Sequence, residues 1–265
     1  MDKGILQVKK KDHLAVLSFN RPEKKNSLSI DLLIAIFQVL EAFAKGNDVR
    51  VVIFRGSGDV AFSSGFDISA IPSKASKEVL EVMKTQNPLE LALDKIKNFK
   101  FPTIAMLNGY AYGAGFNLSM CCDVRIAADD IKMGMPPAKL GLTYHPAGIQ
   151  QFIETIGLGK TREVFLTART YTGEELITNR LVDYLIPRDK LETFTFDYAA
   201  KIAQNAPLAL KGMKKIINMF GHNMALNEIQ KKETEKLIQE SFQSDDLKEG
   251  QMAFLGKRKP VFTGK

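Results

Sequence analysis

The chain has 265 residues, of which 45% are hydrophobic and 25% are charged. These values are close to the averages of globular proteins and exclude a disordered or collagen-like chain. The formal net charge is +7 at pH 7, and we expect some of the basic residues to bind the phosphate groups of a small ligand. Nucleic-acid binding is disfavoured, because no recognised motif or alternation of aromatic and basic residues accompanies the charge.

The sequence lacks long apolar segments and has few cysteines, which bears on the location of the protein and on bound metals. No apolar stretch reaches the ~20 residues that a bilayer crossing needs, and the N-terminal residues do not form a basic start followed by an apolar segment. We therefore expect no membrane association, no export signal and a cytoplasmic location. Cys121 and Cys122 are the only cysteines and are adjacent, so we expect no disulfide framework and no structural metal site.

The first part of the chain alternates between strand and helix patterns. The spacing predicts a hairpin at residues 5–9 and 13–19, a helix at 30–44 capped by Ser29, and a buried strand at 49–54. A helix at 78–98, a second buried strand at 103–107, a glycine-rich turn with a short helix at 113–121 and a third strand at 124–127 follow. A change of period of this kind indicates layers of strands and helices with parallel pairing.

The chain becomes mostly helical after Tyr144. Helices are predicted over residues 147–156, 160–166, 173–179, 190–204, 207–219 and 227–243. One short strand is predicted at 182–186. No repeat or linker divides the sequence, so we expect a sheet-containing core over residues 1–195 and a helical C-terminal region over residues 196–265.

Two turns that contain glycine are the main chemical signal. Residues 61–68 read Ala-Phe-Ser-Ser-Gly-Phe-Asp-Ile and leave backbone N–H groups near Phe66 without strand partners, although such a segment alone is more often only a turn. Residues 108–117 follow a buried strand and precede a helix, so the Ala114 amide is expected at a helix N-terminus, where negative charge is favoured. Two N–H donors directed at one point would form an oxyanion hole.

These segments, with Arg-Pro-Glu-Lys-Lys-Asn at residues 21–26, resemble the enoyl-CoA hydratase/isomerase (crotonase) superfamily. The resemblance covers almost the whole chain, as far as residues 254–260. It implies an α/β fold of the crotonase type, which is a spiral of ββα units with a helical C-terminal trimerisation region. It also implies that the oxyanion-hole amides are those of Phe66 and Ala114, the latter in place of the usual glycine.

The same resemblance implies an acyl-CoA thioester as substrate, with no cofactor beyond its coenzyme A moiety. It implies coenzyme A contacts from Lys24, Lys25, the backbone of Asp67 and Ile68, Phe254 and Lys257. Each lysine could equally be an ordinary surface residue. Members of the superfamily are usually trimers or dimers of trimers, so a homotrimer or a dimer of trimers is expected.

The sequence departs from the hydratases of this superfamily at the two glutamates that handle water and the proton. Asn117 and Pro137 occupy those positions. Neither side chain can exchange a proton at neutral pH, so ordinary hydration is not supported. A pocket without these two anions can accept a substrate that itself carries a carboxylate.

The loop at residues 139–149 resembles that of the methylmalonyl-CoA decarboxylases, a group in which a tyrosine at the position of Tyr144 lies against the substrate carboxylate. Loss of CO2 from a malonyl-type thioester leaves an enolate that the two amides would stabilise. We therefore predict a lyase, with water or Tyr144 as the proton donor. Tyr144 could instead be a packing residue, Asn117 could orient the acyl group or only satisfy local backbone groups, and His145 is a lesser catalytic candidate.

Two further functions remain open from the sequence. The chain could be a hydratase or isomerase with a displaced acid or base, such as His145 or an aspartate whose position the sequence does not indicate. It could also be a non-catalytic member that binds coenzyme A or RNA on the same fold.

Overall fold

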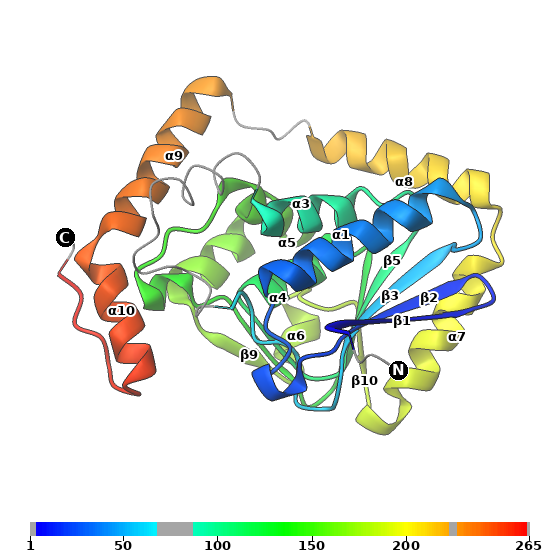
Figure 1. Ribbon diagram of the computed structural model, residues 1–265, viewed down its shortest axis with the longest axis horizontal. Coiled ribbons are helices and arrows are strands. Elements are labelled where there is room, and N and C mark those ends of the chain that lie inside the picture. Colours follow the sequence, from blue (N-terminus) through cyan, green and yellow to red (C-terminus); the bar gives the residue numbers. More distant parts are fainter. Residues whose placement is uncertain (1–3, 68–86, 223–226, 264–265) are drawn as a thin grey trace.

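The computed structural model describes residues 4–67, 87–222 and 227–263. Its centre is a six-stranded sheet in the order β1-β2-β3-β5-β7-β10 (Figure 1). The strands are β1 (Leu6–Lys11), β2 (Leu14–Phe19), β3 (Val51–Gly56), β5 (Thr103–Leu107), β7 (Val124–Ala128) and β10 (Tyr184–Ile186). β1 and β2 form the predicted antiparallel hairpin, and every other neighbouring pair is parallel.

A second sheet of four strands lies beside the first, in the order β4-β6-β8-β9. These strands have three residues each: β4 (Ala61–Ser63), β6 (Tyr110–Tyr112), β8 (Lys132–Gly134) and β9 (Thr170–Thr172). After each of β3, β5 and β7, the chain leaves the first sheet and enters the second, where it forms β4, β6 and β8 respectively. A helix then returns the chain, which confirms the predicted ββα arrangement.

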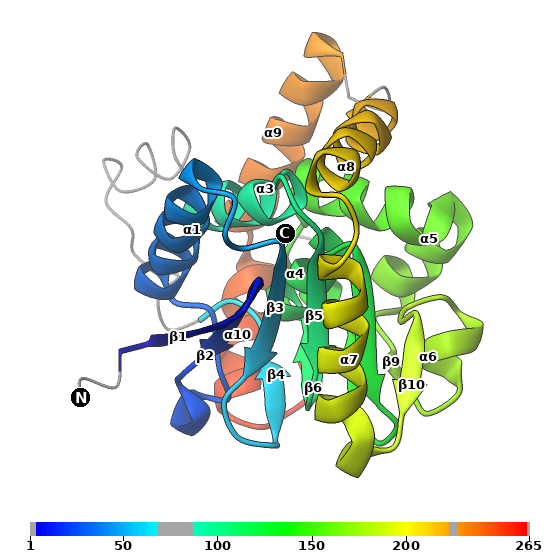
Figure 2. The same cartoon turned by 90° about the vertical axis from the view of Figure 1, so that its right-hand side faces the viewer.

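Helices cover the sheets and fill the space between them. They are α1 (Ile30–Lys45), α3 (Pro88–Lys97), α4 (Ala114–Cys121), α5 (Pro146–Thr167), α6 (Glu175–Thr178) and α7 (Leu191–Ala203), with short 3-10 turns η1 (Pro22–Lys24), η3 (Pro137–Leu140) and η4 (Arg188–Lys190). The Leu32 amide donates to Ser29 Oγ at 3.3 Å, so Ser29 caps α1 as predicted. All residues of α4 are buried, while α7 packs along β2, β3, β5 and β7 (Figure 2).

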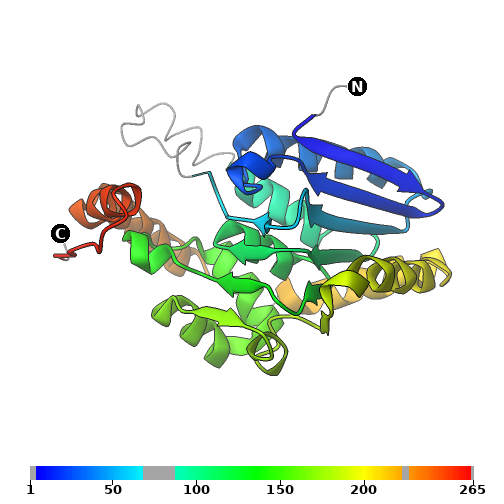
Figure 3. The ribbon, with the colours of Figure 1, turned by 90° about the horizontal axis from the view of Figure 1, so that it is seen from below.

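The C-terminal region is helical, as predicted, and extends away from the sheets. It consists of α8 (Pro207–His222), α9 (Glu228–Gln243) and α10 (Asp245–Leu255). Lys214 ties α8 to the core, because its ammonium group donates to the Phe101 carbonyl at 3.0 Å and to Asp123 at 2.6 Å. α10 packs on η3, and α8 and α10 lie at opposite ends of the molecule (Figure 3). No helix in the described ranges is both long and apolar enough for a bilayer crossing.

The two helices expected at 147–156 and 160–166 are confirmed as the two parts of α5, which are separated where Gly157 leaves the helical conformation with φ 78° and ψ 161°. Other elements differ from the sequence prediction. Of the helix expected at 78–98, the described part is α3. The second sheet and α10 were not predicted. The expected division at residue 195 lies within α7, and it stays a prediction.

Candidate active site

Two backbone amides, those of Phe66 and Ala114, lie at the ends of matching turns. Each follows a glycine with positive φ, because Gly65 has φ 103° and Gly113 has φ 52°. Leu28 forms a parallel bridge with Phe66, in which the Leu28 amide donates to the Gly65 carbonyl at 2.8 Å and the Asp67 amide donates to the Leu28 carbonyl at 3.1 Å. These bonds use the groups on either side of Phe66, so its own amide points away from Leu28.

Both amides lack an internal partner among the described residues. Within the ranges that the structure describes, no hydrogen-bond acceptor is found for the N–H of Phe66 or of Ala114. Ala114 is the first residue of α4, and the amides of a helix's first turn have no partner inside the helix. Its φ is not positive, so alanine replaces glycine at this position without backbone strain.

The two turns are in contact. A Cβ atom added to Gly65 would lie 2.8 Å from the Tyr112 carbonyl oxygen and 3.4 Å from the Ala114 nitrogen. A Cβ on Gly115 would lie 2.6 Å from Cβ of Ser63, which is closer than real side chains approach one another. The glycines therefore allow β4 and the start of α4 to meet, and the two free amides lie next to each other at this junction, where the positive end of the α4 dipole favours an anion.

A hydrogen-bonded group of four side chains lies one turn further along α4. The Tyr144 hydroxyl donates to Asn117 Oδ1 at 3.0 Å, and Asn117 Nδ2 donates to Gln151 Oε1 at 2.6 Å. The Cys121 thiol donates to the same Gln151 oxygen at 2.9 Å. Asn117 is fully buried and Gln151 is 7% exposed, while Tyr144 is half-buried. We call these four residues the polar cluster.

Gly148 makes the polar cluster possible. A Cβ atom at this position would lie 2.4 Å from Tyr144 Cε1 and 2.7 Å from Asn117 Oδ1. Any side chain at residue 148 would therefore force the phenol away from the amide. The sequence alone indicates no role for Gly148, Gln151 or Cys121. The available signal was the spacing of residues 148 and 151, which places them one turn apart on a helix beside Tyr144.

The polar cluster carries no charge at neutral pH. Burial raises the pKa of the Tyr144 phenol well above its usual range, and the neighbouring Cys121 and Glu90 raise it further. Burial also raises the pKa of the Cys121 thiol. Tyr144 keeps its proton, and its ring packs 5.4 Å from the ring of Phe165, measured between centroids. Tyr144 is thus both a packing residue and a hydrogen-bond donor.

His145 follows Tyr144 in the chain but faces another direction. Its Nδ1 accepts from the Ala147 amide at 3.4 Å, which caps α5, and its Nε2 lies 3.1 Å from Glu90 Oε1 on α3. The imidazole is 44% exposed. The structure therefore places His145 outside the polar cluster, where it links the beginnings of two helices.

Lys24 and Lys25 lie close to the Phe66 turn along the backbone. Both are exposed, and Lys25 has a left-handed φ of 55° at the end of η1. The Ser64 amide donates to the Lys25 carbonyl at 3.0 Å, which fixes this turn beside the residues that precede Gly65. The predicted lysines thus reach solvent near the amide pair.

The backbone at Asp67 is less available than predicted. Its amide is used by the Leu28 carbonyl, and its carboxylate pairs with Arg21 at 3.0 Å. The parallel bridge to Leu28 accounts for this use of the amide. Ile68 lies outside the described residues.

The remaining predicted contacts lie in the C-terminal region. Phe254, on α10, is 60% exposed, and Lys257 follows the helix with φ 50°. α10 stands apart from β1 and β2 and the turn that follows them (Figure 3).

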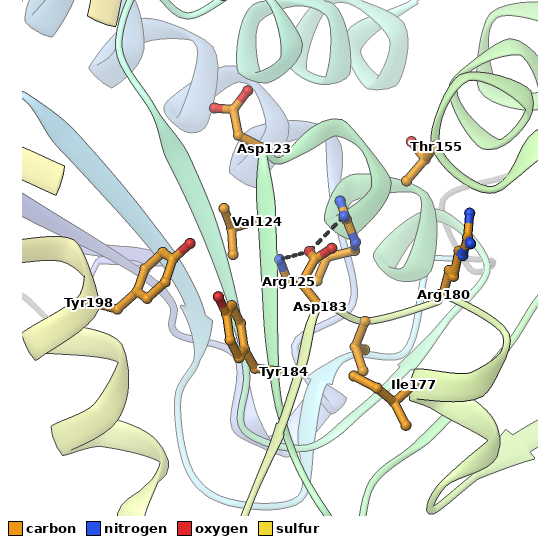
Figure 4. Close-up of a pocket in the computed structure, with 10 residues that line it drawn as sticks. Asp123, Val124, Arg125, Thr155, Ile177, Arg180, Asp183, Tyr184 and Tyr198 are labelled. Carbon is orange, nitrogen blue, oxygen red and sulfur yellow. Dashed lines mark hydrogen bonds and ion pairs between the residues drawn. The ribbon is translucent and has the colours of Figure 1, made fainter.

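Two surface pockets lie elsewhere in the described part of the chain. One of about 500 Å³ is bordered by β7, α5, β10 and α7, and contains the Arg125–Asp183 ion pair at 2.6 Å (Figure 4). The other, of about 550 Å³, lies between α8 and residues 98–100. Neither is lined by any of the predicted site residues. The described ranges contain no group of three or more His, Cys, Asp or Glu residues that could hold a metal ion.

Comparison with known proteins gives a consistent result. The sequence profile of the Enoyl-CoA hydratase/isomerase family matches residues 9–265. The chain is 30% identical over 252 residues to the methylmalonyl-CoA decarboxylase of Escherichia coli, with 95% of both chains covered. It is also 30% identical over 252 residues to the short-chain-enoyl-CoA hydratase of Clostridium acetobutylicum, again with 95% of both covered.

Solved structures agree over the full length. A structure of methylmalonyl-CoA decarboxylase in complex with 2-nitronate-propionyl-CoA superposes with a TM-score of 0.90 at 29% identity, covering 99% of each chain. An enoyl-CoA hydratase from Bacillus anthracis superposes with a TM-score of 0.75 at 29% identity, covering 99% of this chain and 100% of that one. From the profile match and the shared ββα architecture, the chain belongs to the enoyl-CoA hydratase/isomerase family and has the crotonase fold.

Proposed function

We propose that the chain is an acyl-CoA decarboxylase that acts on a small malonyl-type thioester such as methylmalonyl-CoA, with no cofactor beyond the coenzyme A moiety. The observation that carries this proposal is that the groups around Asn117 are uncharged. Its hydrogen-bond partners in the described ranges are Tyr144, Gln151 and Cys121, and none of them is a carboxylate. Pro137, the other departure from the hydratase pattern, is buried at the start of η3.

The free amides of Phe66 and Ala114 supply the electrophilic assistance. They donate to the thioester carbonyl oxygen while the bond between the α-carbon and the carboxylate carbon breaks. The electron pair of that bond moves into the thioester as an enolate, CO2 leaves, and the α-carbon then takes up a proton from water or from Tyr144. No general base is needed to start the reaction. One donor of this kind contributes about 10²–10³ in rate.

The Ala114 donor can be removed while the helix is kept. Ala114 is the first residue of α4, a position at which proline is tolerated because its N–H is not used within the helix. We expect Ala114→Pro to lower the decarboxylation rate by about 10²–10³. Ala114→Gly keeps the N–H and is the control. Because the proline ring also places Cδ where the N–H pointed, the difference between the two variants is an upper limit on the contribution of the donor.

The direct test is incubation of the purified protein with methylmalonyl-CoA, with measurement of CO2 release and of the thioester product by chromatography. Release of CO2 with formation of propionyl-CoA supports the proposal. Hydration of crotonyl-CoA without any CO2 from methylmalonyl-CoA would contradict it.

A second function, hydration or isomerisation of an enoyl-CoA, is favoured by the pairing of His145 with Glu90. This pair could act as a displaced acid and base, and hydratases are among the relatives at about the same identity. Water uptake into crotonyl-CoA that is abolished by Glu90→Gln would support this function over decarboxylation.

We also propose that the chain assembles as a homotrimer or a dimer of trimers through its C-terminal helices. α8 and α9 expose several large apolar side chains, which a protein that remained monomeric would rarely leave in water. They include Leu208, Ile216, Ile217, Phe220 and Ile229. Sedimentation of the purified protein as a monomer at micromolar concentration would contradict the assembly.

A further inference from the structure

The single proton of the Tyr144 hydroxyl is already committed in the polar cluster. It is donated to Asn117 Oδ1 at 3.0 Å, and a phenol has no second proton to donate. In this state, Tyr144 presents only oxygen lone pairs to any other group. A carboxylate also presents only lone pairs, so the arrangement does not favour a carboxylate beside Tyr144.

The same four side chains can form a second, reversed arrangement. Rotation of a terminal amide by 180° exchanges its oxygen and nitrogen without a change of shape. With both amides rotated, Gln151 Nε2 donates to Asn117 Oδ1 and to Cys121 Sγ, and Asn117 Nδ2 donates to the Tyr144 oxygen. The cluster then has three internal hydrogen bonds, compared with four in the observed state, of which the one from Asn117 Nδ2 to Cys121 Sγ is the longest at 3.9 Å. In exchange, the Tyr144 proton is released.

We propose that Gln151 is a positioning residue, whose amide orientation decides whether Tyr144 donates to Asn117 or to a carboxylate on the acyl group. A carboxylated thioester then selects the reversed arrangement, because only that arrangement offers it the hydroxyl proton. The inference rests on the proposed function for the position of the acyl group beside Tyr144, and it names the acyl groups that this site selects.

Because the cluster is buried, the orientation of the Gln151 amide determines the orientation of the Asn117 amide. Asn117 is 0% exposed and Gln151 is 7% exposed, so water does not readily replace either partner, and an unpaired amide at this depth is costly. Asn117 can turn only if Gln151 turns with it. An amide at residue 117 is essential to the reversal, since an ionised glutamate there could only accept from Tyr144.

The test uses binding and not turnover. Two coenzyme A thioethers that cannot decarboxylate, carboxypropyl-CoA and propyl-CoA, are titrated by calorimetry against the wild type, Gln151→Glu, Tyr144→Phe and the double variant. The measured quantity is the ratio of the two dissociation constants. We expect the wild type to prefer the carboxylated ligand and to keep that preference across the pH range.

The ionised carboxylate that Gln151→Glu introduces would accept only, so it would hold Asn117 Nδ2 and keep Tyr144 donating to Asn117. We expect Q151E to lose about tenfold or more of the preference at high pH, the size of one hydrogen bond to a charged group. The preference should return as the pH falls, because a protonated carboxyl can donate to Asn117. In the Tyr144→Phe background, Q151E should change the preference by less than about twofold.

Several results would overturn the inference. They are a wild type that shows no preference for the carboxylated ligand, a Q151E that keeps the preference, and a loss that is equally large without the Tyr144 hydroxyl. The last would mean direct repulsion by the new charge. If Q151E does not fold, Asn117→Asp tests the same point, because an ionised aspartate also only accepts, and its effect should again vanish with Tyr144→Phe. A wild type that prefers the carboxylated ligand but releases no CO2 would contradict the proposed function and leave this inference standing.

Discussion

Replacing Gly148 by alanine tests whether the contact between Tyr144 and Asn117 matters. The new Cβ would lie 2.4 Å from Tyr144 Cε1 and 2.7 Å from Asn117 Oδ1. Carbon atoms pack at about 3.5 Å or more, so the phenol ring must move by roughly 1 Å. Such a shift lengthens the 3.0 Å hydrogen bond between Tyr144 and Asn117 beyond a useful distance.

The cost can be worked from these contacts. The lost hydrogen bond costs about 1 kcal/mol, overpacking costs about 1–3 kcal/mol, and the better helix propensity of alanine returns about 1 kcal/mol. The net loss is about 2 kcal/mol, which lowers Tm by roughly 5 °C. A misplacement of about 1 Å in a group that positions the substrate costs about 10² in kcat/KM.

Gly159→Ala is the matched control, because it lies in α5 just beyond the break at Gly157 and an added Cβ meets nothing within 4 Å. It adds a methyl group without a clash, so we expect an unchanged or slightly raised Tm and full activity. Thermal unfolding and decarboxylation assays of both variants make the comparison. A Gly148→Ala protein as stable and as active as Gly159→Ala would refute the assigned role of Gly148.

Three further variants or treatments follow from the site. Gly115→Ala places a Cβ 2.6 Å from Ser63 Cβ, which pushes α4 away from β4, and we expect decarboxylation to fall by about 10² while circular dichroism still reports a folded protein. Tyr144→Phe leaves Asn117 Oδ1 without its donor and should cost about 1–3 kcal/mol in urea unfolding; because burial raises the pKa of Tyr144, the wild-type rate should show no inflection near about pH 10, where a free phenol titrates. Cys121 is buried, and burial raises its pKa, so a thiol reagent at neutral pH should label it only after unfolding; rapid labelling of the native protein would contradict its place in the polar cluster.

The local features of the fold could be predicted from the sequence. The long helices and the five- and six-residue buried strands carry clear periodicity, and Ser29 marks the start of α1. The second sheet could not be found in this way, because strands of three residues such as Ala61–Ser63 are too short to show alternation. These short strands form because each follows a strand of the first sheet, whose end places it beside its partners in the second sheet.

The same division holds for the site. The Phe66 and Ala114 turns were found because glycine at residues 65 and 113 reports on local backbone geometry. The polar cluster was found only in part, since Asn117 and Gln151 are 34 residues apart and meet through the packing of α4 on α5. Nothing in the local sequence around Gln151 distinguishes a buried amide from an exposed one.

The two donors at the junction of β4 and α4 are main-chain N–H groups, which limits how a substitution can affect them. A substitution at residue 66 or 114 exchanges a side chain but leaves an N–H in place, unless proline is introduced. The two donors therefore survive a change of side chain at residue 66 or 114, whereas Asn117, Pro137 and Tyr144 act through side chains that every substitution alters. The groups around the acyl chain can therefore change on this scaffold while both main-chain donors are kept.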